Sequence, residues 1–187
     1  RKSHEIGDVL AASGKDYVFF ETVGVGQGEH DIINTADICV VVLVPESGDE
    51  IQLMKAGLIE IADIFIVNKS DRKGANRISY LLKNVLHSFS SSGIEPPVFN
   101  TIASNNVGIV ELFIGIQSHL NLMEKSGNLS SKRLKRYRNR VRDQVRETLE
   151  KEFWKLGKTH ALDELTENLE DIREAPHIIA EKLLKNS

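Results

Sequence analysis

A short apolar run followed at once by a polar loop constrains the fold of this chain more than any other stretch. Residues 64–67 read Ile-Phe-Ile-Val, and the polar tetrapeptide Asn-Lys-Ser-Asp follows at residues 68–71. An unbroken run of β-branched and aromatic residues is typical of a strand buried on both faces, as in parallel sheets. Open α/β sheets bind their ligands at the carboxyl ends of such strands. The stretch therefore predicts an α/β fold with a ligand-binding loop at residues 68–71.

Strand-like and helix-like segments alternate along the first 125 residues. We expect strands at residues 17–22, 38–44, 64–67 and 98–100, and helices at residues 2–13, 48–61, 75–89 and 109–123. Turns rich in glycine, serine or proline separate them, and residues 23–28 contain three glycines. This alternation is typical of βαβ units with right-handed crossovers and a parallel sheet.

The composition suits one compact domain with an appendage and argues against several kinds of partner. The 187 residues are 41% hydrophobic, and 24 Lys and Arg oppose 27 Asp and Glu, which gives a net charge of -3. This balance produces no overall field that would attract nucleic acid or an anionic membrane. The single cysteine, Cys39, excludes a disulfide framework. No apolar run reaches the roughly 18 residues of a membrane span, so we expect a cytoplasmic location.

The chain changes character after residue 125. Residues 126–128 read Ser-Gly-Asn, as a linker would, and everything beyond them has a helical pattern. One long helix is expected at residues 131–156, with two shorter amphipathic segments at residues 162–172 and 176–184. Its apolar side chains recur in steps of three and four and form a stripe of Leu134, Tyr137, Val141, Val145, Leu149 and Phe153. We therefore predict an α/β domain at residues 1–125 and a helical arm at residues 126–187.

The apolar stripe of the arm predicts a partner surface. Left exposed, it would form a larger apolar patch than soluble monomers usually tolerate, so we expect a homodimer through residues 130–187. Packing of the stripe back on its own domain is an open alternative. The same helix is basic between residues 132 and 146, but acidic residues return at 147, 150 and 152. Only Tyr137 adds an aromatic ring there, which favours a solvated face or a dimer interface over nucleic-acid binding.

Three segments at successive strand ends carry the chemistry of a nucleotide site. Glu21 and Gly24 stand where nucleotide hydrolases keep a carboxylate that holds Mg²⁺ through water and a glycine that contacts the γ-phosphate. The Asp71 carboxylate can accept hydrogen bonds from N1–H and the 2-amino group of guanine, a pair of donors that adenine lacks. Residues 101–104 follow the next strand, where backbone N–H groups would support the guanine carbonyl oxygen. Each segment alone is equally compatible with an ordinary turn, whereas their order along the chain favours a guanine-nucleotide site.

Longer stretches of the chain resemble one family closely. Residues 21–27 (ETVGVGQ), 41–52 (VVLVPESGDEIQ) and 62–71 (ADIFIVNKSD) are similar to MeaB/ArgK-type GTPases, and residues 175–184 resemble the family's C-terminal pattern. These GTPases are chaperones of methylmalonyl-CoA mutase, and the human counterpart is the cobalamin A-type methylmalonic aciduria protein. The resemblance covers essentially the whole chain.

The resemblance implies the C-terminal portion of a P-loop NTPase (G-protein) domain, followed by an all-α dimerisation arm. It implies GTP or GDP and Mg²⁺ as ligands. It also implies methylmalonyl-CoA mutase as a partner, and that this GTPase gates the loading of adenosylcobalamin onto the mutase and protects that enzyme. In a eukaryote it implies the mitochondrial matrix. By position it implies catalytic roles for Glu21, Gly24 and Gln27, Mg²⁺ binding by Glu21, nucleotide binding by Asn68, Lys69, Asp71, Ile102, Ala103 and Ser104, and a switch role for Asp49, Glu50, Gln52 and Lys55.

Two departures from the family pattern leave alternatives open. The motif G-x-x-x-x-G-K-[ST], whose backbone cradles phosphates, does not occur in the sequence, and the family carries it upstream of the matched stretches. We therefore expect this chain to be the C-terminal part of a longer protein, and by itself to bind GTP at most weakly and to hydrolyse none. The base loop reads Thr-Ile-Ala at residues 101–103 where the family usually has Thr-Ser-Ala. The alternatives are a non-catalytic half that acts as a dimerisation or interaction module, and a transport-linked kinase, which is the family's older label.

Overall fold

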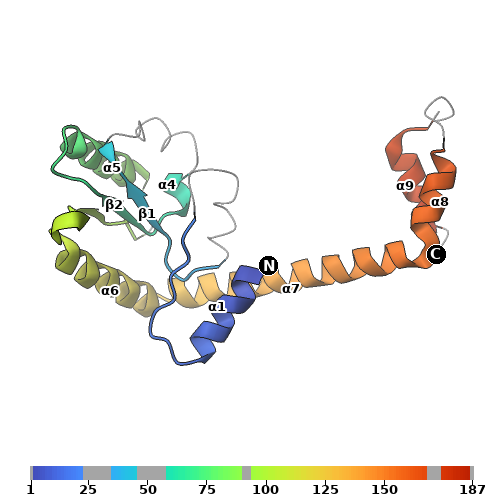
Figure 1. Cartoon of the computed structure of the whole chain (residues 1–187), viewed down its shortest axis with the longest axis horizontal. Helices are drawn as coiled ribbons and strands as arrows, with labels where there is room; N and C mark the ends of the chain where they lie inside the picture. Colours follow the sequence, from blue (N-terminus) through green and yellow to red (C-terminus); the bar gives the residue numbers. More distant parts are fainter. Residues whose placement is uncertain (1, 23–34, 46–57, 90–93, 168–173, 186–187) are drawn as a thin grey trace. The chain divides into compact units, whose positions relative to one another are not determined.

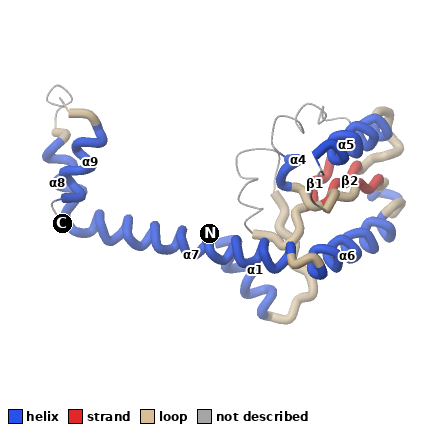
Figure 2. The backbone as a smooth tube through the Cα atoms, turned by 180° about the vertical axis from the view of Figure 1, so that it is seen from behind, coloured by secondary structure: helices blue, strands red, loops and turns tan. Residues whose placement is uncertain are grey.

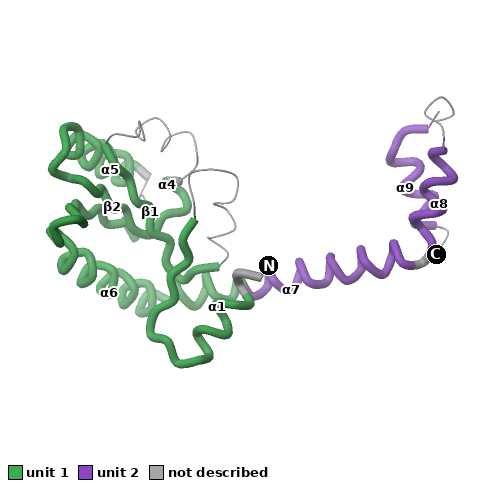
Figure 3. The backbone as a smooth tube through the Cα atoms, in the orientation of Figure 1, with its two compact units in different colours: residues 1–136 green, residues 137–187 purple. Residues whose placement is uncertain are grey.

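The computed structural model describes residues 2–22, 35–45, 58–89, 94–167 and 174–185 of the chain (Figure 1). The chain divides into two compact units, residues 1–136 and 137–187 (Figure 3). The division falls inside one continuous helix, α7 (Asn128–Phe153), whereas the sequence predicted a domain boundary after residue 125. The first turns of α7 belong to the first unit because ion pairs hold them there, as described below. That the parts are a GTPase domain and a dimerisation arm stays a prediction.

A three-stranded parallel sheet forms the centre of the first unit. Its strands are β1 (Val40–Leu43), β2 (Ile64–Val67) and β3 (Val98–Asn100), in the order β1-β2-β3. Phe65 of β2 pairs with Val41 on one side and with Val98 on the other. All four residues of β2 are buried, because the strand has a neighbour at each edge and a helix over each face. The parallel α/β sheet expected from the sequence is confirmed.

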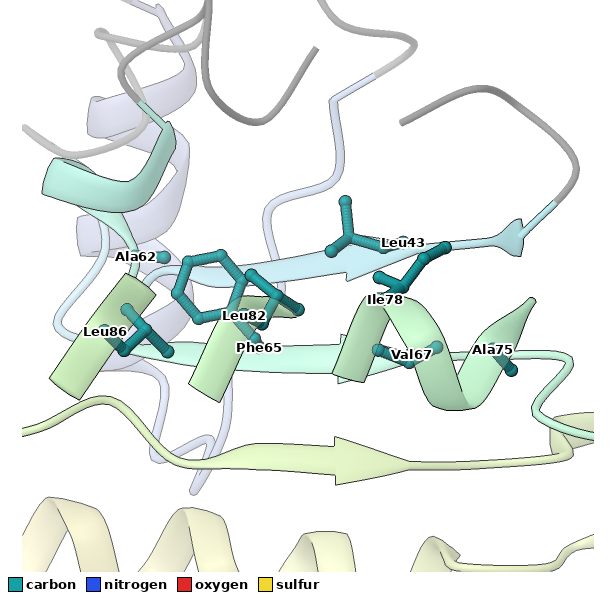
Figure 4. Close-up of a cluster of buried hydrophobic side chains, with 8 residues drawn as sticks. All are labelled: Leu43, Ala62, Phe65, Val67, Ala75, Ile78, Leu82 and Leu86. Atoms are coloured by element: carbon teal, nitrogen blue, oxygen red, sulfur yellow. The ribbon is translucent and has the colours of Figure 1, made fainter. Parts of the chain in front are cut away.

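Helix α5 (Ala75–Phe89) covers one face of the sheet. Alternate strand residues point to the same face, so Leu43, Phe65 and Val67 meet the apolar stripe of α5. Figure 4 shows the resulting core cluster of Leu43, Ala62, Phe65, Val67, Ala75, Ile78, Leu82 and Leu86. Burial of each large apolar side chain contributes roughly 1.5–3 kcal/mol. This cluster therefore fixes β2 and the loop that leaves it.

Helix α6 (Ile109–Lys125) covers the opposite face, and Figures 1 and 2 show α5 and α6 on either side of the strands. Helix α6 approaches β3 closely at Gly115, where a Cβ atom would overlap the ring of Phe99. Both helices begin and end near their predicted residues. Helix α1 (Lys2–Ala12) also confirms its prediction. Of the helix expected at residues 48–61, only α4 (Leu58–Ile61) lies within the described residues.

The strand predicted at residues 17–22 is wrong, because this segment has no ladder in the structure. Its side chains contact helices instead of pairing with a strand. The ring of Phe20 occupies the space beside Gly7 that a Cβ atom would need, and Tyr17 meets Phe113 edge-on with 6.3 Å between ring centroids. Phe19 is 90% exposed. Aromatic and β-branched residues favour a strand only where a neighbouring strand is available to pair with them.

The second unit consists of the distal part of α7, a π-helical turn at Trp154–Lys158, and helices α8 (Thr159–Leu165) and α9 (Pro176–Lys185). Lys158 is buried and donates a hydrogen bond of 2.9 Å to the backbone oxygen of Leu183, which ties the π-helical turn to α9. Its ammonium also lies 5.6 Å from the centroid of the Phe153 ring. Across the described residues, no helix combines the length and the apolar character needed to cross a bilayer.

Candidate functional site

Two loops leave neighbouring strands at the carboxyl edge of the sheet and are joined by backbone hydrogen bonds. Residues 68–71 follow β2 and residues 101–104 follow β3. The Thr101 N–H donates to the Val67 oxygen at 2.9 Å, and the Ser70 N–H donates to the Thr101 oxygen at 3.0 Å. The second of these bonds lies beyond the last pair of the β2–β3 ladder. The two predicted base-binding segments therefore form one continuous surface.

The Asn68 side chain is held by the second loop. Its oxygen accepts hydrogen bonds from the Thr101 hydroxyl and from the Ala103 N–H, both at 3.1 Å. Thr101 is only 2% exposed, so its hydroxyl is shielded from water and its choice of partner is restricted. The two bonds fix the carboxamide plane of Asn68. The Ala103 N–H is engaged inside the protein by the same contact.

Thr101 is a positioning residue that the sequence interpretation did not single out. The sequence placed Thr101 in the loop at residues 101–104 but predicted nucleotide binding only for Ile102, Ala103 and Ser104, of which Ile102 is half-buried and the other two are exposed. The available signal was a hydroxyl residue directly after a strand, beside a loop with a predicted polar task. A side-chain partner 33 residues away in the sequence is visible only in the fold.

The base tetrapeptide contains a residue in the left-handed backbone region. Lys69 has a φ of 55°, which costs a non-glycine residue roughly 1–2 kcal/mol. The turn is closed by the Arg72 N–H, which donates to the Lys69 oxygen at 2.9 Å. This conformation brings the chain out of β2 sharply and leaves Asp71 exposed before α5 begins. Backbone strain of this kind is common where a loop serves a ligand.

The base loop is a tight turn that depends on Gly108. Residues Ala103–Asn105 form one 3₁₀ turn, and Ile102 and Val107 bridge across its base. Gly108 has a φ of 77°, and a Cβ atom there would collide with the Asn100 oxygen. A larger residue would push the end of β3 away from the start of α6. The loop is thus fixed from both sides.

Of the residues predicted to have catalytic or switch roles, the structure describes only one. Glu21 is described and exposed. Gly24 and Gln27, and the switch residues Asp49, Glu50, Gln52 and Lys55, lie outside the described residues. The structure thus brings Asn68, Lys69 and Asp71 next to the loop of Ile102, Ala103 and Ser104, and it leaves the catalytic and switch predictions untested.

A family comparison agrees with this geometry. A family model described as methylmalonyl-CoA mutase-associated GTPase MeaB matches residues 1–158. The chain belongs to the MeaB family. This confirms the family resemblance of the sequence and the α/β P-loop NTPase fold class.

Individual relatives support the same assignment for this MeaB-family chain. A protein of Pyrococcus abyssi, described as a candidate GTPase, is 47% identical over 138 residues, which are 72% of this chain and 43% of that protein. The methylmalonic aciduria type A homolog, mitochondrial, of Mus musculus is 32% identical over 165 residues, which are 86% of this chain and 39% of that protein. This chain thus spans less than half the length of these relatives. In fold, it is similar to the crystal structure of LAO/AO transport system kinase, with a TM-score of 0.71 at 21% identity over 98% of this chain and 61% of that one.

Of the residues predicted to bind Mg²⁺, the structure describes Glu21. Within the described ranges, no three His, Cys, Asp or Glu side chains gather as a metal would require. Glu21 is a single exposed carboxylate, which suits a ligand that reaches Mg²⁺ through a water molecule. A shallow hollow of about 450 Å³ lies elsewhere, lined by Lys83, His87 and Glu95 among others. It borders the amino end of β3, at the opposite edge of the sheet from the two loops, and plays no part in this site.

Proposed function

We propose that the two joined loops bind the guanine base of GTP and GDP, within a GTPase that serves methylmalonyl-CoA mutase. The observation that carries the proposal is the fixed Asn68 side chain, whose oxygen accepts from Thr101 and Ala103 at 3.1 Å. Such preorganisation spares the loop the loss of side-chain entropy on binding. An ordinary surface turn has no need of a buried hydroxyl that orients an amide.

Each loop residue would take one part of the base. The Asp71 carboxylate would accept from N1–H and the 2-amino group, and the Asn68 amide nitrogen would donate to the base edge. The stem of Lys69 would lie along the ring, and the backbone of residues 102–104 would support the carbonyl oxygen. Because the Ala103 N–H is engaged with Asn68, guanine would share that donor or use a neighbouring one. Glu21 would hold Mg²⁺ through water.

The finer role follows from the family. We propose that the whole GTPase gates the delivery of adenosylcobalamin to the mutase and protects that enzyme, with Gly24, Gln27 and the switch residues responding to the γ-phosphate. We also propose a homodimer through residues 130–187. Leu134, Tyr137, Val141, Val145 and Leu149 are each between 45% and 66% exposed, so the described structure leaves this stripe for a partner.

The base assignment can be tested on the chain as it stands. Amide spectra of the purified chain would be recorded with GDP, ADP and xanthosine diphosphate at millimolar concentrations. We expect GDP, but not ADP, to shift the signals of residues 68–71 and 101–104. Asp71→Asn should move the preference to xanthosine diphosphate, because the C2 oxygen of xanthine can accept from an amide. Asp143→Asn, an exposed acid on α7, is the matched control.

Two results of this experiment would count against the assignment. Equal shifts with ADP and GDP, or an Asp71→Asn variant that keeps its preference for GDP, would contradict guanine recognition. Hydrolysis is a separate question, because the phosphate-cradling motif is not in this sequence. We expect no GTPase activity above background from the chain alone. Steady hydrolysis that Glu21→Ala abolishes would show that expectation to be wrong and would rule out the purely non-catalytic alternative.

A further inference from the structure

Two guanidinium groups of α7 converge on one carboxylate in front of β1. Arg133 donates to both oxygens of Asp37, at 3.1 and 2.5 Å, and Arg136 donates to Asp37 at 2.7 Å. Arg136 also donates to the Ala36 oxygen at 2.7 Å. Bidentate guanidinium–carboxylate pairs are among the stronger and more directional polar contacts. Basic residues expected on a solvated face or in a dimer interface are therefore paired within the chain.

A second ion pair lies beside the first, in front of β2. The Lys132 ammonium contacts Asp63 at 2.5 Å, and the Cys39 N–H donates to the same carboxylate oxygen at 2.6 Å. The Lys132 and Asp63 side chains are only 22% and 17% exposed. Because the pair is largely shielded, it is screened less by salt than a surface pair. Without α7 the Asp63 carboxylate would keep the Cys39 N–H as a donor and would lose its cation.

The three cations share one face of the first turns of α7. Residues 129, 132, 133 and 136 are spaced by three and four, so their side chains line one side of the helix. Leu129 is the one side chain of α7 that the structure buries deeply, at 3% exposure. The side-chain contacts that tie this stretch, Asn128–Arg136, to Asp37 and Asp63 are therefore ionic. We call this stretch the root of α7.

The titratable group next to the second pair does not compete with it. His119 of α6 is buried, and burial lowers its pKa, although the nearby Asp63 opposes the shift and Lys132 adds to it. Because the His119 imidazole is neutral, the ammonium of Lys132 is the cation that pairs with Asp63. Both carboxylates lie before the amino ends of their strands, which is the edge of the sheet opposite the base loops.

We propose that Asp37 and Asp63 form an ionic latch that holds the root of α7 on the amino ends of β1 and β2. Neutralising the latch releases the root while the sheet and its core stay folded, because the core cluster around Phe65 includes no residue of α7. The latch makes the docking of the root, within the first unit, a matter of charge, and strong screening or loss of a carboxylate releases it. The proposal does not depend on nucleotide binding.

Hydrogen exchange of the backbone amides tests the latch on the intact chain. Exchange at residues 130–136 would be compared in wild type, Asp37→Asn and Asp143→Asn, which removes an exposed carboxylate paired only with Arg146 of the same helix. We expect exchange at the root to quicken about tenfold or more in Asp37→Asn, as for a local opening that loses its anchoring contacts. Exchange at residues 64–67 and 78–86 should stay at the wild-type rate, and Asp143→Asn should resemble wild type throughout.

The salt response of the wild type gives a second, independent readout. Raising NaCl from roughly 50 mM to 1 M shortens the Debye length from about 14 to 3 Å. Because the Arg133 and Asp37 side chains are 54% and 35% exposed, salt should screen this pair more than the shielded Lys132–Asp63 pair and should speed exchange at the root selectively. Root exchange that is the same in Asp37→Asn as in Asp143→Asn would overturn the latch. If Asp37→Asn failed to fold, Arg136→Gln and the salt series would decide, and a root insensitive to both would overturn it.

Discussion

The buried hydroxyl of Thr101 donates to the side-chain oxygen of Asn68 across 3.1 Å, although 33 residues separate the two in the chain. The contact joins the ends of β2 and β3 through side chains at the point where their backbones also meet. It converts two short loops into one rigid edge. Without the Thr101 hydroxyl, only the Ala103 N–H would hold the Asn68 oxygen.

Removal of the Thr101 hydroxyl should loosen this edge. Thr101→Val keeps the branched shape and should cost about 1 kcal/mol of unfolding free energy, because Asn68 loses one of two donors. Urea unfolding and amide exchange at Ala103 would measure it. Thr101→Ser, which keeps the hydroxyl, is the control and should hold Ala103 more firmly than the valine variant does. Identical exchange at Ala103 in both variants would count against the positioning role.

Gly108 and Gly127 form a matched pair for testing the base loop. Both have left-handed backbone angles, with φ of 77° and 78°, but a Cβ atom would collide with Asn100 only at Gly108 and would meet open space at Gly127. We expect Gly127→Ala to cost about 1 kcal/mol, the cost of the backbone angle alone. Gly108→Ala should cost about 2–4 kcal/mol, since the end of β3 must also move. Equal losses in thermal or urea unfolding would show that the close approach is unimportant.

The Asp37 carboxylate makes stability depend on pH in the acidic range. Hydrogen bonds from Arg133, with help from Arg136, lower its pKa from 3.8 to about 2 against the opposing effect of burial. Because the folded pKa lies below the unfolded one, the stabilisation is complete above roughly pH 5 and is lost as the pH falls towards 2.

Urea unfolding at several pH values would check this. Asp37→Asn should be less stable than wild type by about 1 kcal/mol near neutral pH, a figure reduced for the partial exposure of the carboxylate. The difference should narrow below about pH 4. A difference that stays constant down to the lowest accessible pH would mean that the ionised carboxylate contributes nothing.

The apolar stripe of α7 should mediate self-association. Val141→Asp with Val145→Asp places two charges on residues that are 45% and 52% exposed and should abolish a dimer seen by light scattering at about 50 μM. Lys151→Asp, which changes a charge on another face of the same helix, should leave the dimer intact. A monomeric wild type, or a dimer that survives both aspartates, would refute this interface.

Features that depend on a local pattern of residues could be predicted before the fold was known. A parallel strand between helices could be predicted from the apolar run at residues 64–67 and from the helical periodicity at 75–89 and 109–123. The spacing of apolar residues and the length of the segment distinguish a buried strand from a helix. The family motifs likewise predicted which residues would bind the base, and that assignment stays a prediction. The same reasoning failed at residues 17–22, where strand-forming residues found helices rather than a strand as neighbours.

The partners of the polar and charged residues, in contrast, are visible only in the folded chain. No periodicity reveals that Thr101 orients Asn68, or that Lys132, Arg133 and Arg136 of an apparently solvated basic stretch pair with Asp63 and Asp37. The burial of apolar residues can be predicted from the sequence, because they recur with the period of the helix or strand that contains them. A hydrogen bond or ion pair depends instead on two side chains that folding brings together from distant positions in the chain. The local sequence around either residue therefore does not predict its partner.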